Sequence, residues 1–267
     1  MSLTAAPAES LPVVVLLHSS MSSQSQWNKL VARESGRYRF VAVDLLGYGR
    51  SPFPLEPDSF TLGHEVDAVM ASIAAHVDTH EPLHLVGHSY GGATALRLAR
   101  ELGPRVRSLC VFEPVAFHLL PQGSPARTEI VAVVASIEAA PTRTAAARSF
   151  IDYWNGAGTF DTLPEAQQAR FAAQIDKVKL DFQALLGEPA TLADCAQLDM
   201  PALVLSGSAS PRSTREVAAQ LASALGDARS AQVAGGHMAP ITHADAVNEL
   251  IGEFLREHAL EAAGAAL

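Results

Sequence analysis

The chain has 267 residues, a length that suits one large α/β domain with an insertion, and its 48% hydrophobic content excludes a disordered chain. The net charge of −9 and the lack of a Lys/Arg cluster argue against nucleic acid or an anionic membrane surface as a partner. The two cysteines, Cys110 and Cys195, are few enough to suit a reducing compartment.

The first ten residues, MSLTAAPAES, lack the basic start of a secretory signal, and the apolar run VVVLL that follows is too short for one. No stretch has the length that crossing a bilayer requires. We therefore expect a cytoplasmic protein that acts on a small-molecule substrate without a nucleic-acid or membrane partner. The chain is compatible with a homodimer.

Short runs rich in β-branched residues predict six strands. In chain order they are VVVLL (13–17), RFVAVD (39–44), LHLVG (83–87), SLCVFE (108–113), ALVLS (202–206) and ARSAQV (228–233). Most are apolar throughout, as strands of a parallel sheet are when both faces are covered. Helical patterns occur at 61–77, 91–102, 213–225 and 244–258. The alternation predicts an α/β fold with a mostly parallel central sheet flanked by helices.

Residues 117–195 break this alternation. They contain no convincing strand but three Ala-rich helical patterns, at about 126–139, 142–154 and 164–186, separated by Pro and Gly. We interpret this segment as a helical cap inserted into a core that is formed by residues 1–116 and 196–267.

The predicted strand 83–87 runs into the motif Gly87-His88-Ser89-Tyr90-Gly91, and a helical pattern begins at once. A strand that turns directly into a helix crowds the residues two before and two after the corner, so both must be small. Such a corner exposes Ser89 Oγ at the carboxyl edge of the sheet, where the new helix directs its free N–H groups. A serine that only caps the helix is the simpler alternative.

Four motifs in order resemble those of the α/β-hydrolase superfamily. They are VVVLLHSSMSS (13–23), VDLLGYGRS (43–51), GHSYGG (87–92) and GGHMAP (235–240). The resemblance covers nearly the whole chain and implies an α/β-hydrolase fold with a serine nucleophile. It says little about the substrate.

A serine hydroxyl needs a base within hydrogen-bond reach and a third group to orient that base. Among ten histidines, His237 is our candidate for the base, because it follows the last strand after two glycines. His88 should point away from Ser89 and serve in packing, and the family counterpart of His18 shapes the oxyanion loop. The other histidines show no metal-ligand spacing, so we expect no metal and no cofactor.

The acid departs from the family pattern. The resemblance places it after the strand 202–206, where this chain has Ser210. Glu113 ends the strand that follows the serine corner, and some superfamily members, including a branch of the haloalkane dehalogenases, carry their acid there. We predict Glu113 as the acid. A weakened dyad supported by Ser210, or an acid from elsewhere, stays open.

Two backbone N–H groups must face the developing oxyanion. Tyr90, next to the nucleophile, supplies one, and by position in the family Ser20 supplies the other, unless HSSMSS is only a polar loop. For a largely apolar substrate pocket we nominate Ser19, Met21, Phe117, Trp154 and Met238. Arg212 is the one nearby charge for an anionic substrate, although the pattern favours a plain surface arginine.

These residues predict a serine hydrolase that cleaves a small carboxylic ester, thioester or lactone through an acyl-enzyme on Ser89. One alternative is a non-hydrolytic enzyme on the same scaffold, such as a lyase, an acyltransferase or a cofactor-free perhydrolase. Another is a catalytically weak binding protein that lacks the usual aspartate.

Overall fold

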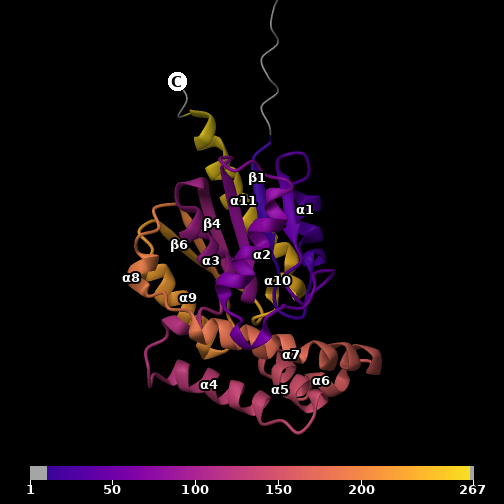
Figure 1. Cartoon of the computed structure of the whole chain (residues 1–267). Coiled ribbons are helices and arrows are strands. Elements are labelled where there is room, and N and C mark those ends of the chain that lie inside the picture. The colour runs from indigo at the N-terminus through magenta and orange to yellow at the C-terminus, as the bar shows by residue number, and fades with distance from the viewer. Residues whose placement is uncertain (1–10, 265–267) are drawn as a thin grey trace, which may run out of the picture.

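In the computed structural model, residues 11–264 are described, and they fold around one β-sheet (Figure 1). Six strands within these residues lie in the order β2-β1-β3-β4-β5-β6, and each neighbouring pair is parallel. The strands are β1 (Val13–Leu17), β2 (Arg39–Val43), β3 (Leu83–His88), β4 (Val106–Phe112), β5 (Ala202–Gly207) and β6 (Ala228–Val233). The predicted fold class is confirmed.

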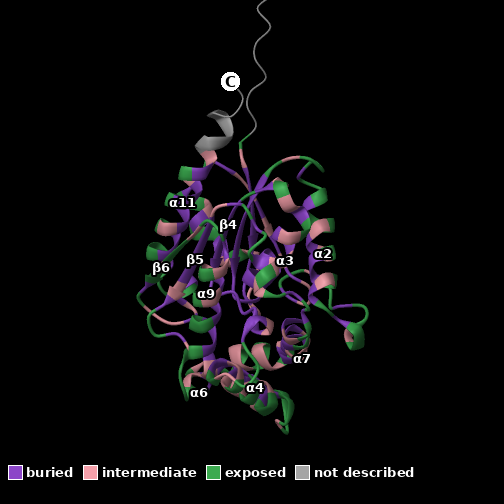
Figure 2. Cartoon of the chain, turned by 90° about the vertical axis from the view of Figure 1, so that its left-hand side faces the viewer, coloured by how far each residue is buried: buried purple, intermediate pink, exposed green. Residues whose placement is uncertain are grey.

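Both faces of the sheet are covered because the strands alternate their side chains between two apolar cores. The helices that flank the sheet are α1 (Asn28–Arg33), α2 (Leu62–Ala74), α3 (Tyr90–Leu102), α9 (Arg212–Ala224) and α11 (Ala244–Gly264), with the short α10 (Ala239–Thr242) before the last. In β1, Val13, Val15 and Leu17 belong to the same buried cluster as side chains of α2, α3 and α9, whereas Val14 and Leu16 belong to a second cluster with side chains of α1 and α11. Figure 2 shows the buried strands between these helices.

Residues 117–195, all of which the structure describes, form helices and no strand; we call them the cap segment. The helices are α4 (Pro125–Glu138), α5 (Arg143–Asn155), α6 (Thr159–Thr162), α7 (Glu165–Gly187) and α8 (Leu192–Cys195). Figure 1 shows α4 to α7 gathered beyond the carboxyl end of the sheet. The side chains of Ser124 and Thr142 cap α4 and α5. That the cap segment is a separate domain stays a prediction.

Among residues 11–264, no helix combines the length and the apolar character that crossing a membrane would require.

The corner at Ser89 is as tight as the glycine pattern predicts. β3 ends at His88, α3 begins at Tyr90, and Ser89 alone makes the turn with a left-handed φ of 56°. A Cβ atom on Gly87 would lie 2.4 Å from the carbonyl oxygen of Gly91. A Cβ atom on Gly91 would lie 2.4 Å from the carbonyl oxygen of His18. Both contacts are with backbone, so neither can be relieved by a side-chain movement.

We predict that Gly91→Ala lowers the free energy of unfolding by about 2 kcal/mol or more, because the added methyl group would clash with the backbone carbonyls of Leu17 and His18 at the end of β1. Urea denaturation monitored by circular dichroism measures the change. Gly226→Ala is the matched control, since a Cβ atom there meets nothing within 4 Å. Equal stability of the two variants would contradict the steric explanation of the corner.

Candidate active site

Three side chains from different strand ends meet at the carboxyl edge of the sheet. Ser89 follows β3, Glu113 follows β4 and His237 follows β6. His237 Nε2 lies 2.9 Å from Ser89 Oγ, and His237 Nδ1 lies 2.7 Å from Glu113 Oε2. All three residues are buried. The register explains the first two positions, because the last residues of β3 and β4, His88 and Phe112, lie opposite each other.

Glu113 is fixed from a second direction. Its Oε1 accepts a 2.7 Å hydrogen bond from the backbone N–H of Gly207, at the end of β5. Burial raises the pKa of the carboxyl group. His237, Ser210 and the Gly207 N–H together lower it by more, so the pKa lies below its ordinary value. Glu113 is therefore an ionised carboxylate. Sequence reasoning did not find Gly207, because a backbone donor leaves no trace in residue type.

Ser210 occupies the place where the resemblance expects the carboxylate. It is buried beside Glu113, and its hydroxyl is close enough to help lower the pKa of that carboxyl group. The hydroxyl lies outside hydrogen-bond geometry with every described residue. In the described part of the chain, Glu113 is the one carboxylate in contact with the His237 ring.

The His237 ring is held on several sides. The Glu113 carboxylate accepts from Nδ1–H, which assigns Nε2 as the acceptor for the Ser89 hydroxyl. The Trp154 ring stacks on the imidazole, with 4.1 Å between the ring centroids. His88 Nε2 donates to the backbone carbonyl of His237 at 2.9 Å, and His88 Nδ1 accepts from Gln26. His88 thus points away from Ser89, as predicted, but it anchors the histidine loop in addition to packing.

The loop after β1 presents its backbone to the same site. His18 Nδ1 donates to the Ser19 carbonyl at 2.7 Å, while His18 Nε2 accepts from the Leu45 N–H at 3.0 Å. In a planar trans peptide the N–H of Ser20 points opposite to the Ser19 carbonyl, so His18 directs this N–H away from itself. Among the described residues, neither the Ser20 N–H nor the Tyr90 N–H donates to a backbone or side-chain acceptor.

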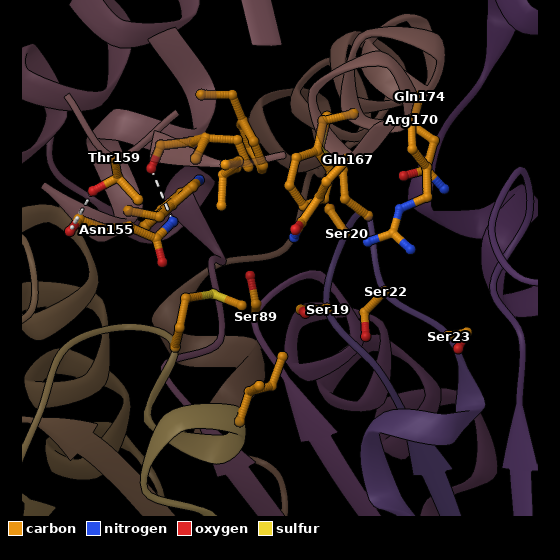
Figure 3. A pocket seen from close by; sticks show the side chains of 18 of the residues that line it. Ser19, Ser20, Ser22, Ser23, Ser89, Asn155, Thr159, Gln167, Arg170 and Gln174 are labelled. Atoms are coloured by element: carbon orange, nitrogen blue, oxygen red, sulfur yellow. Dashed lines mark hydrogen bonds between the residues drawn. The ribbon is translucent and has the colours of Figure 1, made fainter. Parts of the chain in front are cut away.

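A pocket of about 570 Å³ opens above Ser89 (Figure 3). Of the nominated pocket residues, Ser19, Met21, Trp154 and Met238 line it. Phe117 does not, because its ring is fully buried against Phe182. The Ser19 hydroxyl is also less available than expected, since it donates to Gln26 Oε1 at 3.0 Å.

The pocket wall is more polar than the sequence suggested. Gln167, Arg170 and Gln174 of α7 face Ser20, Ser22 and Ser23 across it (Figure 3). Arg212, the charge nominated from the sequence, is exposed and lies outside the lining. Within the described residues, no group of three or more His, Cys, Asp or Glu side chains is placed to hold a metal ion.

Comparison with known proteins shows the family of the chain. Residues 14–250 match the family described as "Alpha/beta hydrolase family". The chain belongs to this family.

Relatives within the family carry several names. The chain is 32% identical over 133 residues to "Probable lysophospholipase BODYGUARD 2" of Arabidopsis thaliana, an alignment that covers 48% of the chain and 28% of that protein. It is 31% identical to "Lipase LipV" of Mycobacterium tuberculosis, covering 46% of the chain and 44% of the relative. The chain thus spans less than half the length of these relatives.

Solved structures share the fold over nearly the whole chain. An enol-lactonase from Burkholderia xenovorans LB400 has a TM-score of 0.72 and 24% sequence identity, covering 92% of both chains. A thermophilic esterase from Thermogutta terrifontis has a TM-score of 0.70 and 23% identity, covering 93% of this chain and 91% of its own.

The buried histidines predict how stability depends on pH. Burial lowers the pKa of His18 to about 4 and that of His84, at the start of β3, also to about 4. Both are neutral when folded and bind a proton near pH 6.5 when unfolded. Between these two pH values the unfolded chain binds protons that the folded protein does not. The free energy of unfolding therefore decreases as the pH is lowered from 6.5 to 4, by up to about 1.4 kcal/mol per pH unit for each histidine.

Urea denaturation at several pH values between 7.5 and 4 measures this slope. His84→Gln, which replaces a ring bonded to the Ser108 hydroxyl, should make the slope shallower by one histidine's share. An unchanged slope in this variant would show that His84 is not the titrating group.

Proposed function

We propose that the protein is a serine hydrolase that cleaves a small carboxylic ester through an acyl-enzyme on Ser89. A thioester or a lactone would react by the same route. The observation that carries the proposal is the unbroken hydrogen-bond path from Ser89 Oγ through His237 to Glu113. A hydroxyl, an imidazole and a carboxylate in this order are the groups that acyl transfer requires.

The proposed reaction begins when His237 Nε2 takes the proton of Ser89 as Oγ attacks the substrate carbonyl. The Glu113 carboxylate stabilises the resulting imidazolium, and the N–H groups of Ser20 and Tyr90 bind the oxyanion. The oxyanion collapses, the ester bond breaks, and His237 returns its proton to the leaving alcohol. Water, deprotonated by His237, then attacks the acyl-enzyme and releases the acid and Ser89.

Relatives support ester cleavage as the reaction class. Names such as lysophospholipase, lipase and methyl ester esterase recur among them, each over part of its length. A haloalkane dehalogenase from Agrobacterium fabrum also matches, at 37% identity over 103 residues. Ser89 at the corner argues against dehalogenation here, since that chemistry uses an aspartate at this position.

Two alternatives differ in what they require of the site. The missing aspartate at position 210 suggested that the protein only binds a ligand and is catalytically weak. The contact between the Glu113 carboxylate and His237 argues against this alternative, because a carboxylate does face the histidine. A lyase, acyltransferase or perhydrolase would use the same three side chains. Product analysis with water, an alcohol and peroxide as competing acceptors separates hydrolysis from transfer.

We expect a fluorophosphonate probe to label the wild-type protein at Ser89. We also expect the variant Glu113→Gln to have a kcat on p-nitrophenyl butyrate about 10³- to 10⁴-fold lower than wild type. The glutamine keeps the shape of the side chain but does not stabilise the imidazolium. Active-site labelling with mass spectrometry and steady-state kinetics measure both effects.

Ser89→Ala is the control that should abolish labelling, and Ser210→Ala is the control for the alternative acid site. Absence of labelling in folded wild-type protein would refute the serine-hydrolase proposal. A Glu113→Gln rate within a few-fold of wild type would refute only the role of Glu113.

The pocket wall favours a substrate that also carries an anionic group. Arg170 makes no ion pair with a described residue, and its guanidinium otherwise lies 5.4 Å from the ring centre of Phe171. Gln174 Oε1, on the same side of the pocket, is buried without a hydrogen-bond partner among the described residues. The exposed Arg170 guanidinium is therefore the group available to an anionic ligand, whereas the Gln174 oxygen is buried and only accepts hydrogen bonds.

We therefore predict that Arg170→Ala raises KM about fivefold for a mono-p-nitrophenyl ester of a dicarboxylic acid, because it removes a partly solvated charge contact. KM for the neutral butyrate ester should stay unchanged. Steady-state kinetics on both esters measure this difference. Arg143→Ala, which removes an arginine paired with Asp176 outside the pocket, is the control. Equal KM changes for the two esters would contradict the prediction.

A further inference from the structure

A group of buried charges lies apart from the Ser89–His237–Glu113 path. Lys177 and Asp181, one turn apart on α7, meet Glu65 of α2, and none of the three side chains is more than 3% exposed. Burying an ion costs several kcal/mol unless partners compensate it. With Tyr48 and Tyr90, these residues form what we call the α7 cluster.

The contacts within the α7 cluster only partly offset the burial of its charges, since one ammonium faces two carboxylates and burial still raises the pKa of Asp181. Lys177 Nζ forms an ion pair with Asp181 and lies 3.2 Å from Glu65 Oε2. The same ammonium lies 4.9 Å from the ring centre of Tyr48 and 4.6 Å from that of Tyr90. Aromatic faces attract a desolvated cation, so the lysine is stabilised on all these sides.

The α7 cluster includes Tyr90 and contacts Ser20, the two residues whose N–H groups are proposed to bind the oxyanion. Tyr90 donates its hydroxyl to Glu65 Oε2 at 2.9 Å. Ser20 donates its hydroxyl to Asp181 Oδ2 at 2.6 Å, across 161 positions of the chain. Tyr48 donates to the same oxygen at 2.5 Å. Ser20 and Tyr90 come from different strand ends, and the cluster joins them.

The loop that carries Ser20 needs such an anchor. Met21, the next residue, has a left-handed φ of 58°. For a residue with a side chain this backbone costs about 1–3 kcal/mol and persists only where the surroundings hold it. His18 holds the Ser19 carbonyl on one side, and Asp181 holds the Ser20 side chain on the other.

We propose that Asp181, held by Lys177, is a positioning residue that sets the direction of the Ser20 N–H and so couples the cap segment to the oxyanion hole. This inference rests on the proposed hydrolase function. Asp181 does not touch the reacting atoms itself; it acts through Ser20.

The proposal predicts that Ser20→Ala and Asp181→Asn each lower kcat on p-nitrophenyl butyrate about tenfold, with KM within twofold of wild type. The negative charge on the carbonyl oxygen is absent from the bound substrate and develops only on the way to the tetrahedral intermediate, so a misdirected donor affects kcat and leaves ground-state binding intact. The effect should be smaller than the roughly 10²- to 10³-fold loss expected when a donor is removed outright.

The double variant should be no slower than the slower single variant, because both changes break the same contact. Steady-state kinetics, fluorophosphonate labelling rates and melting temperatures on all proteins measure the effects. Ser20→Ala removes only a hydroxyl from a half-buried loop residue, so it decides the question if Asp181→Asn fails to fold.

Asp176→Asn is the matched control: the same change, on the same helix, at an exposed ion pair with Arg143. It should keep the wild-type kcat. Variants at Ser20 and Asp181 with wild-type kcat, or with only a raised KM, would overturn this inference while an active wild-type enzyme upholds the proposed function. A wild-type protein that neither labels nor hydrolyses esters would overturn both.

Discussion

The hydrogen bond between Glu113 and His237 is the contact on which the arrangement of the site depends. Position 210 carries no carboxylate, so the orientation of the imidazole rests on a residue from the neighbouring strand. Gly207 makes this possible in two ways: its N–H binds Glu113, and a Cβ atom there would lie 2.6 Å from the Gly235 carbonyl oxygen. The same glycine thus holds the acid and leaves room for the histidine loop.

Backbone strain concentrates where these groups meet. Within the described residues, Met21, Ser89 and Glu113 are the three non-glycine residues with a positive φ, at 58°, 56° and 41°. One lies in the loop after β1, one is the serine of the corner, and one is the acid. Each costs free energy that the packed sheet beneath it must offset, as is common where a fold holds side chains in reactive geometry. The three residues follow β1, β3 and β4, neighbouring strands whose residues are almost all buried, and this packing supports them side by side.

Most strands and helices, and the candidate catalytic side chains, could be predicted from the sequence. The six strands and the long helices follow from apolar runs and periodicity. Ser89 and His237 are predicted from motifs at strand ends, whereas Glu113 is predicted from its place after a strand and from the family resemblance. Contacts between segments that are distant in the sequence could not be predicted from these patterns. The positions of His88 against the His237 carbonyl and of Phe117 in the core depend on how distant segments pack. The pocket arginine is Arg170 of the cap rather than Arg212 for the same reason.

Helix α7 shows how the cap segment takes part in the site. Gln167, Arg170 and Gln174 follow one another at helical spacing along the pocket wall, and Lys177 and Asp181 continue the same stripe into the buried cluster. The first half of this stripe faces the space above Ser89, and the second half binds the loop of Ser20. Because the pocket-lining side chains and Asp181 belong to one helix, a displacement of α7 as a whole would move both together. One helix therefore lines the pocket above Ser89 and also binds the loop that is proposed to stabilise the transition state.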